Sequence, residues 1–109
     1  MHAVKRIEIV ADSIELSKIL KGLKQANVTH YTVFRNVETS GKDPFGEQRT
    51  NRSESDATLI DMAYVIAFCS PEQLKPAVEV LRPILNKFGG ACYLSDAIEV
   101  RSLNCIASL

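Results

Sequence analysis

Hydrophobic and polar residues alternate along residues 4–10, which is typical of a β-strand. Ile7 and Ile9 fall on one face of this segment, and Arg6 and Glu8 fall on the other. The period then lengthens to that of an α-helix, with apolar side chains on one face at Leu16, Ile19, Leu20 and Leu23. The chain is therefore predicted to begin with a strand that is followed by an amphipathic helix.

Three further apolar segments and a second helix are predicted along the rest of the chain. Residues 28–37 are rich in β-branched and aromatic side chains, which favour a strand. Residues 59–70 form a nearly continuous apolar run, as expected for a strand that is buried on both faces. A helix is predicted over residues 70–88, and Gly89 is expected to end it. Residues 91–103 then predict one or two short strands.

The second helix contains an unusual number of prolines. Ser70 and Gln73 have the spacing of a capping box, and Pro71 stands at the first helical position, where its missing N–H is harmless. Pro76 and Pro83, in contrast, fall inside the helix, where each removes a backbone donor. We therefore expect these two prolines to distort or interrupt the helix.

The order of the predicted elements is strand–helix–strand, a long polar insert, and strand–helix–strand. This order is that of an α+β, ferredoxin-like β-α-β-β-α-β sandwich. The length of 109 residues fits a single domain that spans residues 1–109. Because the two middle strands of this fold are antiparallel neighbours, the insert between them is expected to project from one end of the sheet.

The polar insert is the least usual part of the sequence. Nine charged residues fall among the 22 positions from Arg35 to Asp56, and Val37 and Phe45 are the only large apolar residues there. So long a connection is uncommon in a compact domain unless it is functional or disordered. Because the insert lacks the apolar surface to fold alone, we expect it to stay mobile until a partner orders it.

The cations of the insert suggest an anion as one such partner. Arginine makes strong and directional contacts with phosphates and other anions. Glycines in the insert allow backbone angles that other residues avoid. The candidate residues for binding an anion or a partner are Ser40, Gly41, Lys42, Arg49 and Arg52. A solvated loop without a ligand is the alternative interpretation.

Composition and charge narrow the class of protein further. The chain is 46% hydrophobic and 24% charged, with a formal net charge of +0, which is ordinary for a globular domain. This neutral balance argues against a general nucleic-acid-binding protein. No apolar run of about 18 residues predicts a membrane span, and no signal peptide is apparent, so we expect a cytoplasmic protein.

No pattern of catalytic residues is found in the sequence. His2 and His30 are the only histidines, and His30 is expected to be structural or to face solvent. Cys69, Cys92 and Cys105 lack the paired spacing of a metal site, and the first two are expected to be small buried apolar residues. The sequence therefore predicts no enzymatic activity, no metal and no covalent cofactor.

Taken in order, three segments resemble the PII-like signalling proteins over nearly the whole chain. The stretch VTHYTVFRNVETSG resembles the second strand of the family and the start of its T-loop. Residues 36–58 match the T-loop in place and length. Residues 86–91 are similar to the B-loop, and FGGACYLSDAIEVRS is similar to the B-loop with the closing strand.

This resemblance implies a homotrimer with a cleft between neighbouring subunits. An adenine nucleotide would bind in each cleft, between the base of the T-loop and the B-loop. The nucleotide would set the conformation of the T-loop, which would dock onto a target protein or release it. The residues that the resemblance assigns to nucleotide binding are Ile7, Ile9, Thr32, Phe34, Arg35, Asn36, Lys87, Gly89, Gly90 and Arg101.

The sequence departs from the nitrogen-sensing PII proteins at two points. No tyrosine lies between Phe34 and Leu59, where those proteins carry a tyrosine that is modified. Ala91 follows Gly90, where those proteins carry a phosphate-binding lysine. A weaker hold on a triphosphate favours ADP or AMP, with cAMP and ATP as further candidates. Nitrogen sensing is therefore not predicted.

The branch that the chain resembles most is the carbon-related one, which includes carboxysome-associated and SbtB-like proteins. It implies bicarbonate as a second effector and a target in inorganic-carbon uptake or fixation. That target would be a membrane transporter or a carboxysome component, so the protein would reside in the cytoplasm, at the carboxysome, or at the membrane through a transporter.

Three alternatives to this assignment differ in ligand or partner. The first is a cAMP- or AMP-binding regulator of a bicarbonate transporter. The second is an RNA-binding module on the ferredoxin-like fold, which would need aromatic residues on two central strands and a basic surface. The third is a trimeric metal-tolerance protein of similar topology, which would need a cluster of metal ligands.

Overall fold

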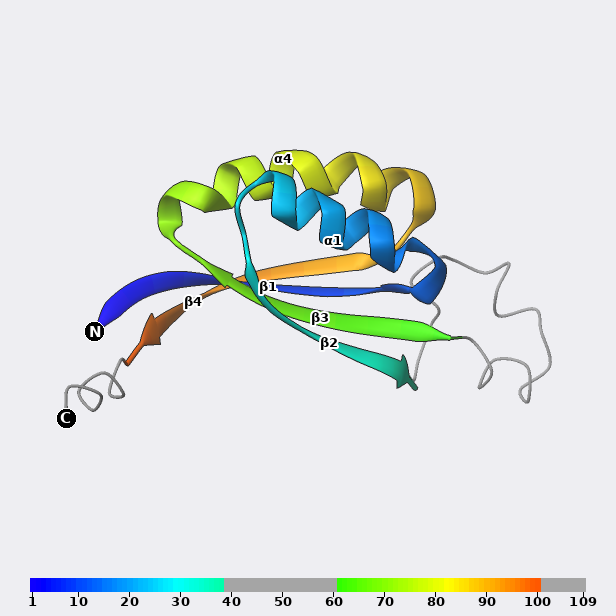
Figure 1. Cartoon of the computed structure of the whole chain (residues 1–109), viewed down its shortest axis with the longest axis horizontal. Helices are drawn as coiled ribbons and strands as arrows, with labels where there is room; N and C mark the ends of the chain where they lie inside the picture. Colours follow the sequence, from blue (N-terminus) through cyan, green and yellow to red (C-terminus); the bar gives the residue numbers. More distant parts are fainter. Residues whose placement is uncertain (39–60, 101–109) are drawn as a thin grey trace.

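The computed structural model describes residues 1–38 and 61–100 of the chain. Its elements are, in order, β1 (His2–Asp12), the 3-10 helix η1 (Ser13–Glu15), α1 (Leu16–Gln25), β2 (His30–Val37), β3 (Met62–Cys69), α4 (Pro71–Phe88) and β4 (Ala91–Glu99). This order confirms the predicted ferredoxin-like α+β fold (Figure 1). Residues 91–99 form one strand, where one or two short strands were expected.

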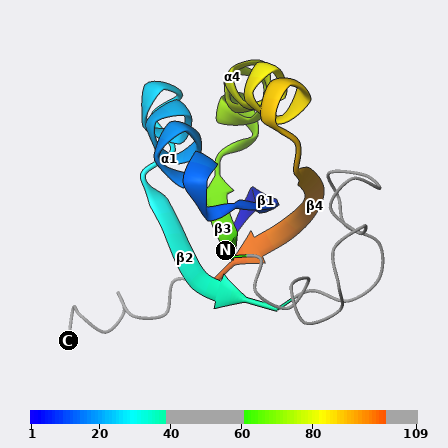
Figure 2. The same cartoon turned by 90° about the vertical axis from the view of Figure 1, so that its right-hand side faces the viewer.

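The four strands form one sheet in the order β2-β3-β1-β4, and all neighbours are antiparallel. Both helices lie against the same face of this sheet, as Figures 1 and 2 show. We call the other surface of the sheet the open face. The alternation along β1 explains the arrangement, because Ile7 and Ile9 point toward the helices while Arg6 and Glu8 point to the open face.

The core lies between the sheet and the two helices. Its fully buried large side chains include Ile7, Ile9, Ile19, Leu23, Val65 and Leu81. The helices approach closely at Gly22, where an added Cβ would lie 2.8 Å from Cγ1 of Val80. Cys69 is buried and Cys92 is half-buried against the core, as the sequence predicted, and burial raises the pKa of both thiols.

The prediction that the third strand is buried on both faces is wrong for the single chain. Val65 and Ala67 are buried under the helices, but Ile66 is half-buried and Phe68 is 42% exposed on the open face. An antiparallel sheet often leaves one face toward solvent, and that face then carries polar side chains. The open face of this sheet is more apolar than that rule predicts.

Helix α4 begins as predicted. The side-chain oxygen of Gln73 accepts hydrogen bonds from the backbone N–H of Ser70 at 2.8 Å and from its hydroxyl at 3.1 Å. The side-chain amide of Gln73 donates to the backbone oxygen of Asn27 at 2.7 Å, which links the start of α4 to the end of α1. These bonds anchor one end of the helical layer.

The expectation that Pro76 and Pro83 interrupt α4 is wrong, because the helix runs from Pro71 to Phe88 without a break. Both prolines stand on the exposed side of the helix. The carbonyls four residues earlier, at Glu72 and Glu79, belong to exposed residues, so water is able to replace the missing backbone donors.

The antiparallel register gives the sheet two distinct ends. At the loop end, β2 finishes at Val37, β3 starts at Met62, and β4 starts at Ala91. At the opposite end, which we call the terminal end, lie the start of β1 and the end of β4 at Glu99. A nine-residue strand such as β4 separates its own ends by about 26 Å, at about 3.3 Å per residue.

Candidate functional site

The last residues of β2 form the base of the polar insert. The pairing of β2 with β3 shifts register between Arg35 and Val37, and Asn36 between them has a φ of 57°. Asparagine tolerates this left-handed conformation better than most residues, and an irregularity of this kind bends a strand and redirects its side chains. Phe34, Arg35 and Asn36 are all exposed there, so their side chains are available to a ligand at the loop end.

Two glycines form a second feature of the loop end. Gly89 ends α4 as predicted, with a φ of 88° and a backbone N–H that donates to the oxygen of Leu85 at 2.8 Å. Gly90 has a φ of 127°, and an added Cβ there would lie 3.0 Å from the backbone oxygen of Val10. The glycines therefore let the chain turn tightly beside β1. Lys87 precedes them with an exposed side chain, and its ammonium lies 5.3 Å from the ring centre of Phe88.

The loop base and the glycine pair lie at the same end of the sheet but on opposite edges. Strands β3 and β1 separate β2 from β4, so three steps of about 4.8 Å place the two features about 14 Å apart. The structure therefore brings Arg35 and Asn36 to the same end as Gly89 and Gly90. It does not bring them into direct contact within one chain.

The remaining candidates on the strands have different surroundings. Ile7 and Ile9 are 0% exposed and belong to the core. These two side chains leave no exposed surface for a nucleotide in the single chain, and their assignment to nucleotide binding stays a prediction. Thr32 is exposed on the open face, where it pairs with Ile66 of β3.

Several predicted residues lie outside the described part of the chain. They are the loop candidates Ser40, Gly41, Lys42, Arg49 and Arg52, together with Arg101. The same holds for most of the predicted T-loop, residues 36–58, and for Cys105. Arg101 is joined directly to Val100, which follows β4 at the terminal end of the sheet.

A polar network that the sequence analysis did not identify lies at the centre of the open face. The guanidinium of Arg6 donates to Oε2 of Glu8 at 2.5 Å, and the hydroxyl of Tyr64 donates to the same oxygen at 2.7 Å. The ring of Tyr64 also contacts Phe34, with 5.9 Å between the ring centres. Side chains from β1 and β3 are therefore linked to the base of the insert.

The network changes the acid–base behaviour of two of its members. The hydrogen bond from Tyr64 is the largest influence on Glu8 and, helped by the charge of Arg6, holds the pKa of this carboxyl below its ordinary value. The bond to the Glu8 carboxylate, with partial burial, raises the pKa of Tyr64. The network thus keeps Glu8 ionised and Tyr64 protonated over a wide pH range.

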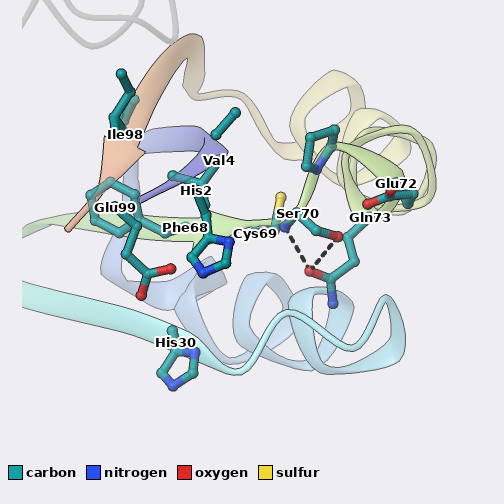
Figure 3. Close-up of a pocket in the computed structure, with 13 residues that line it drawn as sticks. His2, Val4, His30, Phe68, Cys69, Ser70, Glu72, Gln73, Ile98 and Glu99 are labelled. Atoms are coloured by element: carbon teal, nitrogen blue, oxygen red, sulfur yellow. Dashed lines mark hydrogen bonds between the residues drawn. The ribbon is translucent and has the colours of Figure 1, made fainter. Parts of the chain in front are cut away.

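A pocket of about 790 Å³ lies at the terminal end, away from the loop base (Figure 3). Its polar lining includes His2, His30 and Glu99, and Phe68 adds an apolar wall. Residues at the start of α4, from Ser70 to Gln73, complete it. Among the described residues, none of those predicted from the sequence to bind the nucleotide lines this pocket.

Within residues 1–38 and 61–100, no group of three or more His, Cys, Asp or Glu residues is arranged to hold a metal ion. No helix in the same described segments is long and apolar enough to cross a membrane.

The match to a known family decides the assignment. Residues 4–104 match the family model for nitrogen regulatory protein P-II. The chain belongs to the PII family. This family consists of regulatory signalling proteins, which agrees with the prediction of a signalling role. A comparison with curated proteins found no match.

Several solved PII-like structures have the same fold. The CPII protein of Thiomonas intermedia, bound to ADP, AMP and acetate, is 20% identical, with a TM-score of 0.72 over 94% of this chain and 93% of that chain. CPII bound to ADP, AMP and bicarbonate is 19% identical, with a TM-score of 0.71 over 92% and 96% of the two chains. A putative PII-like signalling protein of Thermus thermophilus is 18% identical, with a TM-score of 0.60 over 94% and 95%.

The open-face network and the pocket could not be predicted from the sequence, each for a different reason. Arg6 and Glu8 stand on the polar side of an alternating strand, a pattern that predicts two exposed charges and gives no sign of Tyr64 across the sheet. The pocket combines residues from all four strands and from the start of α4. Only the strand order shows that His2 and His30 belong to one surface.

Proposed function

We propose that this PII-family chain is a non-enzymatic sensor that binds ADP or AMP between two copies of itself. Bicarbonate acts as a second ligand in this proposal, and the chain forms a homotrimer. The insert, as the T-loop, transmits the bound state to a target protein in inorganic-carbon uptake or fixation. The target is a membrane transporter or a carboxysome component.

The observation that carries this proposal is the separation of the candidate residues between the two ends of the sheet. Arg35, Asn36 and the glycine pair lie at the loop end, whereas β4 ends at Glu99 at the terminal end, two residues before Arg101 in the sequence. One nine-residue strand separates these ends by about 26 Å. A single compact site that uses both groups therefore requires a second copy of the chain, whose terminal end meets the loop end of the first.

The local structure of the loop end supports phosphate binding there. Gly89 and Gly90 both have positive φ, and consecutive backbone N–H groups in such turns form concave sites for anions. Arg35 and Lys87 are exposed at the same end and supply positive charge. Because Ala91 follows the glycines, the turn lacks one further cation, and this favours a di- or monophosphate over ATP.

Bicarbonate and the carbon-related target are supported by the similarity of this chain to solved PII-like structures and not by the geometry of its own site. The Thiomonas protein with this fold binds ADP, AMP and bicarbonate. A small anion beside a nucleotide phosphate also suits the cations of the insert, which include Lys42, Arg49 and Arg52.

An RNA-binding module is a weaker candidate, although the open face carries the aromatic residues Phe34, Phe68 and Tyr93. The charges at the centre of that face, Arg6 and Glu8, pair with each other, so the centre offers no surplus of positive charge to a phosphate backbone. The chain as a whole has a formal net charge of +0, whereas nucleic-acid-binding domains carry a basic surplus.

Calorimetric titration of the purified protein with AMP, ADP, ATP and cAMP, each with and without bicarbonate, tests this proposal. The expected result is micromolar binding of ADP or AMP that changes when bicarbonate is present. Nucleotide binding that ignores bicarbonate would keep the nucleotide sensor and remove the carbon-related role. Absence of binding by all four nucleotides would contradict the proposed function.

A further inference from the structure

Two lysines from different helices converge on one aromatic ring at the loop end of the molecule. The ammonium of Lys18 on α1 lies 4.7 Å from the ring centre of Phe88, and the ammonium of Lys87 lies 5.3 Å from the same centre. The start of α1 and the end of α4 lie at this same end of the fold (Figure 1). We call Lys18, Lys87 and Phe88 the lysine cluster. Contacts between a cation and an aromatic ring are favourable, so Phe88 holds both ammonium groups beside the last turn of α4.

The lysine cluster carries more positive than negative charge. The ammonium of Lys18 donates to Oε1 of Glu15 at 3.1 Å, and the side chain of Glu15 is only 14% exposed. Among the described residues, no carboxylate lies within ion-pair distance of Lys87. Two like charges that converge on one ring repel each other, and an anion beside both of them would remove this repulsion.

The lysine cluster is adjacent to the turn at Gly89 and Gly90. Phe88 precedes Gly89 directly, and two residues of chain span at most about 7 Å. The turn has no charged side chain of its own, because Ala91 follows the two glycines. Positive charge for a phosphate at the turn therefore comes from side chains around it. The side chain of Lys18 is 49% exposed, and a lysine is long and flexible, so its ammonium is able to move from the ring to a group at the turn.

We infer that Lys18 binds the second phosphate of ADP and thereby makes the site prefer ADP to AMP. This inference rests on the proposed function, in which a nucleotide phosphate binds at the loop end. Lys87 supplies one cation, which suits a single phosphate, whereas a diphosphate is held best by two cations. The carboxylate of Glu15 keeps the ammonium of Lys18 near the turn before the nucleotide arrives. A lysine that is already held in this way loses less conformational freedom when it binds.

A purely structural role for Lys18 is the alternative, because its contact with Phe88 also joins α1 to α4. Loss of that contact would lower the stability of the protein and would affect ADP and AMP binding to the same degree. Loss of a contact with the second phosphate would weaken the binding of ADP alone. The ratio of the two affinities therefore distinguishes the two roles.

Isothermal titration calorimetry with ADP and with AMP, on the full-length chain and on two variants, measures this ratio. Lys18→Met keeps an unbranched stem against Phe88 but removes the ammonium. Lys21→Met is the matched control, because Lys21 is the next lysine on the same helix and is also exposed. Urea unfolding of each protein shows whether a variant has lost stability.

The unaltered protein and Lys21→Met are expected to bind ADP more tightly than AMP, with equal affinities in the two proteins. Lys18→Met is expected to raise the dissociation constant for ADP by about tenfold and that for AMP by less than about twofold. Equal changes for ADP and AMP, or an ADP affinity that matches the control, would overturn the inference. The proposed function would then still stand on nucleotide binding by the unaltered protein. Absence of all nucleotide binding by the unaltered protein would overturn both.

Two further variants separate the charge of Lys18 from its packing. Lys18→Arg keeps the positive charge and is expected to retain the preference for ADP. Lys18→Gln removes the charge, is expected to lose the preference, and carries the test if Lys18→Met fails to fold. The same preference for ADP in the arginine and glutamine variants would overturn the inference.

Discussion

The hydroxyl of Tyr64 donates a hydrogen bond to the carboxylate of Glu8 at 2.7 Å, and this bond joins β3 to β1 at the centre of the open face. Both side chains are placed there by the alternation of their strands, while their neighbours Val65 and Ile9 point into the core. The ionisation of Glu8 and Tyr64 is therefore linked to the pairing of β1 with β3.

The stability of the protein is expected to depend on pH through this bond. The pKa of Glu8 is below its ordinary value of 4.5 in the folded state, so its contribution is present above that value and is lost as the pH falls through the lowered pKa. The pKa of Tyr64 is above its ordinary value of 10.0, so its contribution is present below 10.0 and is lost as the pH rises through the raised pKa.

Urea unfolding across the pH range, followed by circular dichroism, measures this dependence. Tyr64→Phe removes the hydroxyl while keeping the ring that packs against Phe34. This variant is expected to lose the alkaline decline and to show a smaller acid decline than the unaltered protein. Identical pH profiles for the two proteins would show that the bond contributes nothing to stability.

Ile9→Ala is expected to reduce stability rather than nucleotide binding. Ile9 is 0% exposed within the core, and truncation of such a side chain costs about 2–5 kcal/mol in the free energy of unfolding. Chemical denaturation gives this cost, and calorimetry on the fraction that remains folded gives the nucleotide affinity. A large loss of affinity in a protein of normal stability would place Ile9 at the ligand after all.

Gly90→Ala is expected to strain the turn that follows α4. The φ of 127° at Gly90 is unfavourable for alanine, and the new Cβ would lie 3.0 Å from the Val10 oxygen. Backbone strain of this kind costs about 1–3 kcal/mol. Asn86→Ala is a suitable control, because Asn86 is exposed in the last turn of the same helix. Equal unfolding free energies for the two variants would show that the turn is not constrained.

The fold could be predicted from the sequence because its elements carry strong local signals. The alternation of Ile7 and Ile9 with Arg6 and Glu8 predicted the first strand and the two sets of side chains on its faces. The Ser70–Gln73 pair and Gly89 marked the two ends of α4. The two prolines gave a misleading signal, since the effect of an internal proline depends on whether solvent is available to its unpaired carbonyl.

The site was harder to predict, because it depends on distances that no local pattern contains. The sequence placed Arg35, Gly90 and Arg101 in one site on the basis of family resemblance. The strand order puts Arg35 and Gly90 at opposite edges of the sheet. Strand β4 then runs from the loop end to Glu99 at the terminal end, two residues before Arg101 in the sequence. The Arg6–Glu8–Tyr64 network likewise depends on the pairing of β1 with β3, which brings residues 56 positions apart into contact.

A nucleotide site shared between two copies of the chain can be detected by mixing two defective variants. Arg35→Ala and Arg101→Ala are each expected to weaken ADP binding by about 1–3 kcal/mol, because each removes a charge-assisted contact. The two variants are then unfolded together, refolded as mixed assemblies and titrated with ADP. Each pure variant, treated in the same way, is the control.

In a random mixture, about one quarter of the sites combine the intact Arg35 of one subunit with the intact Arg101 of its neighbour. If the site is shared between two copies, about one quarter of the sites in the mixture will regain the affinity of the unaltered protein for ADP. A refolded mixture that assembles but regains no such sites would contradict a site shared between two copies.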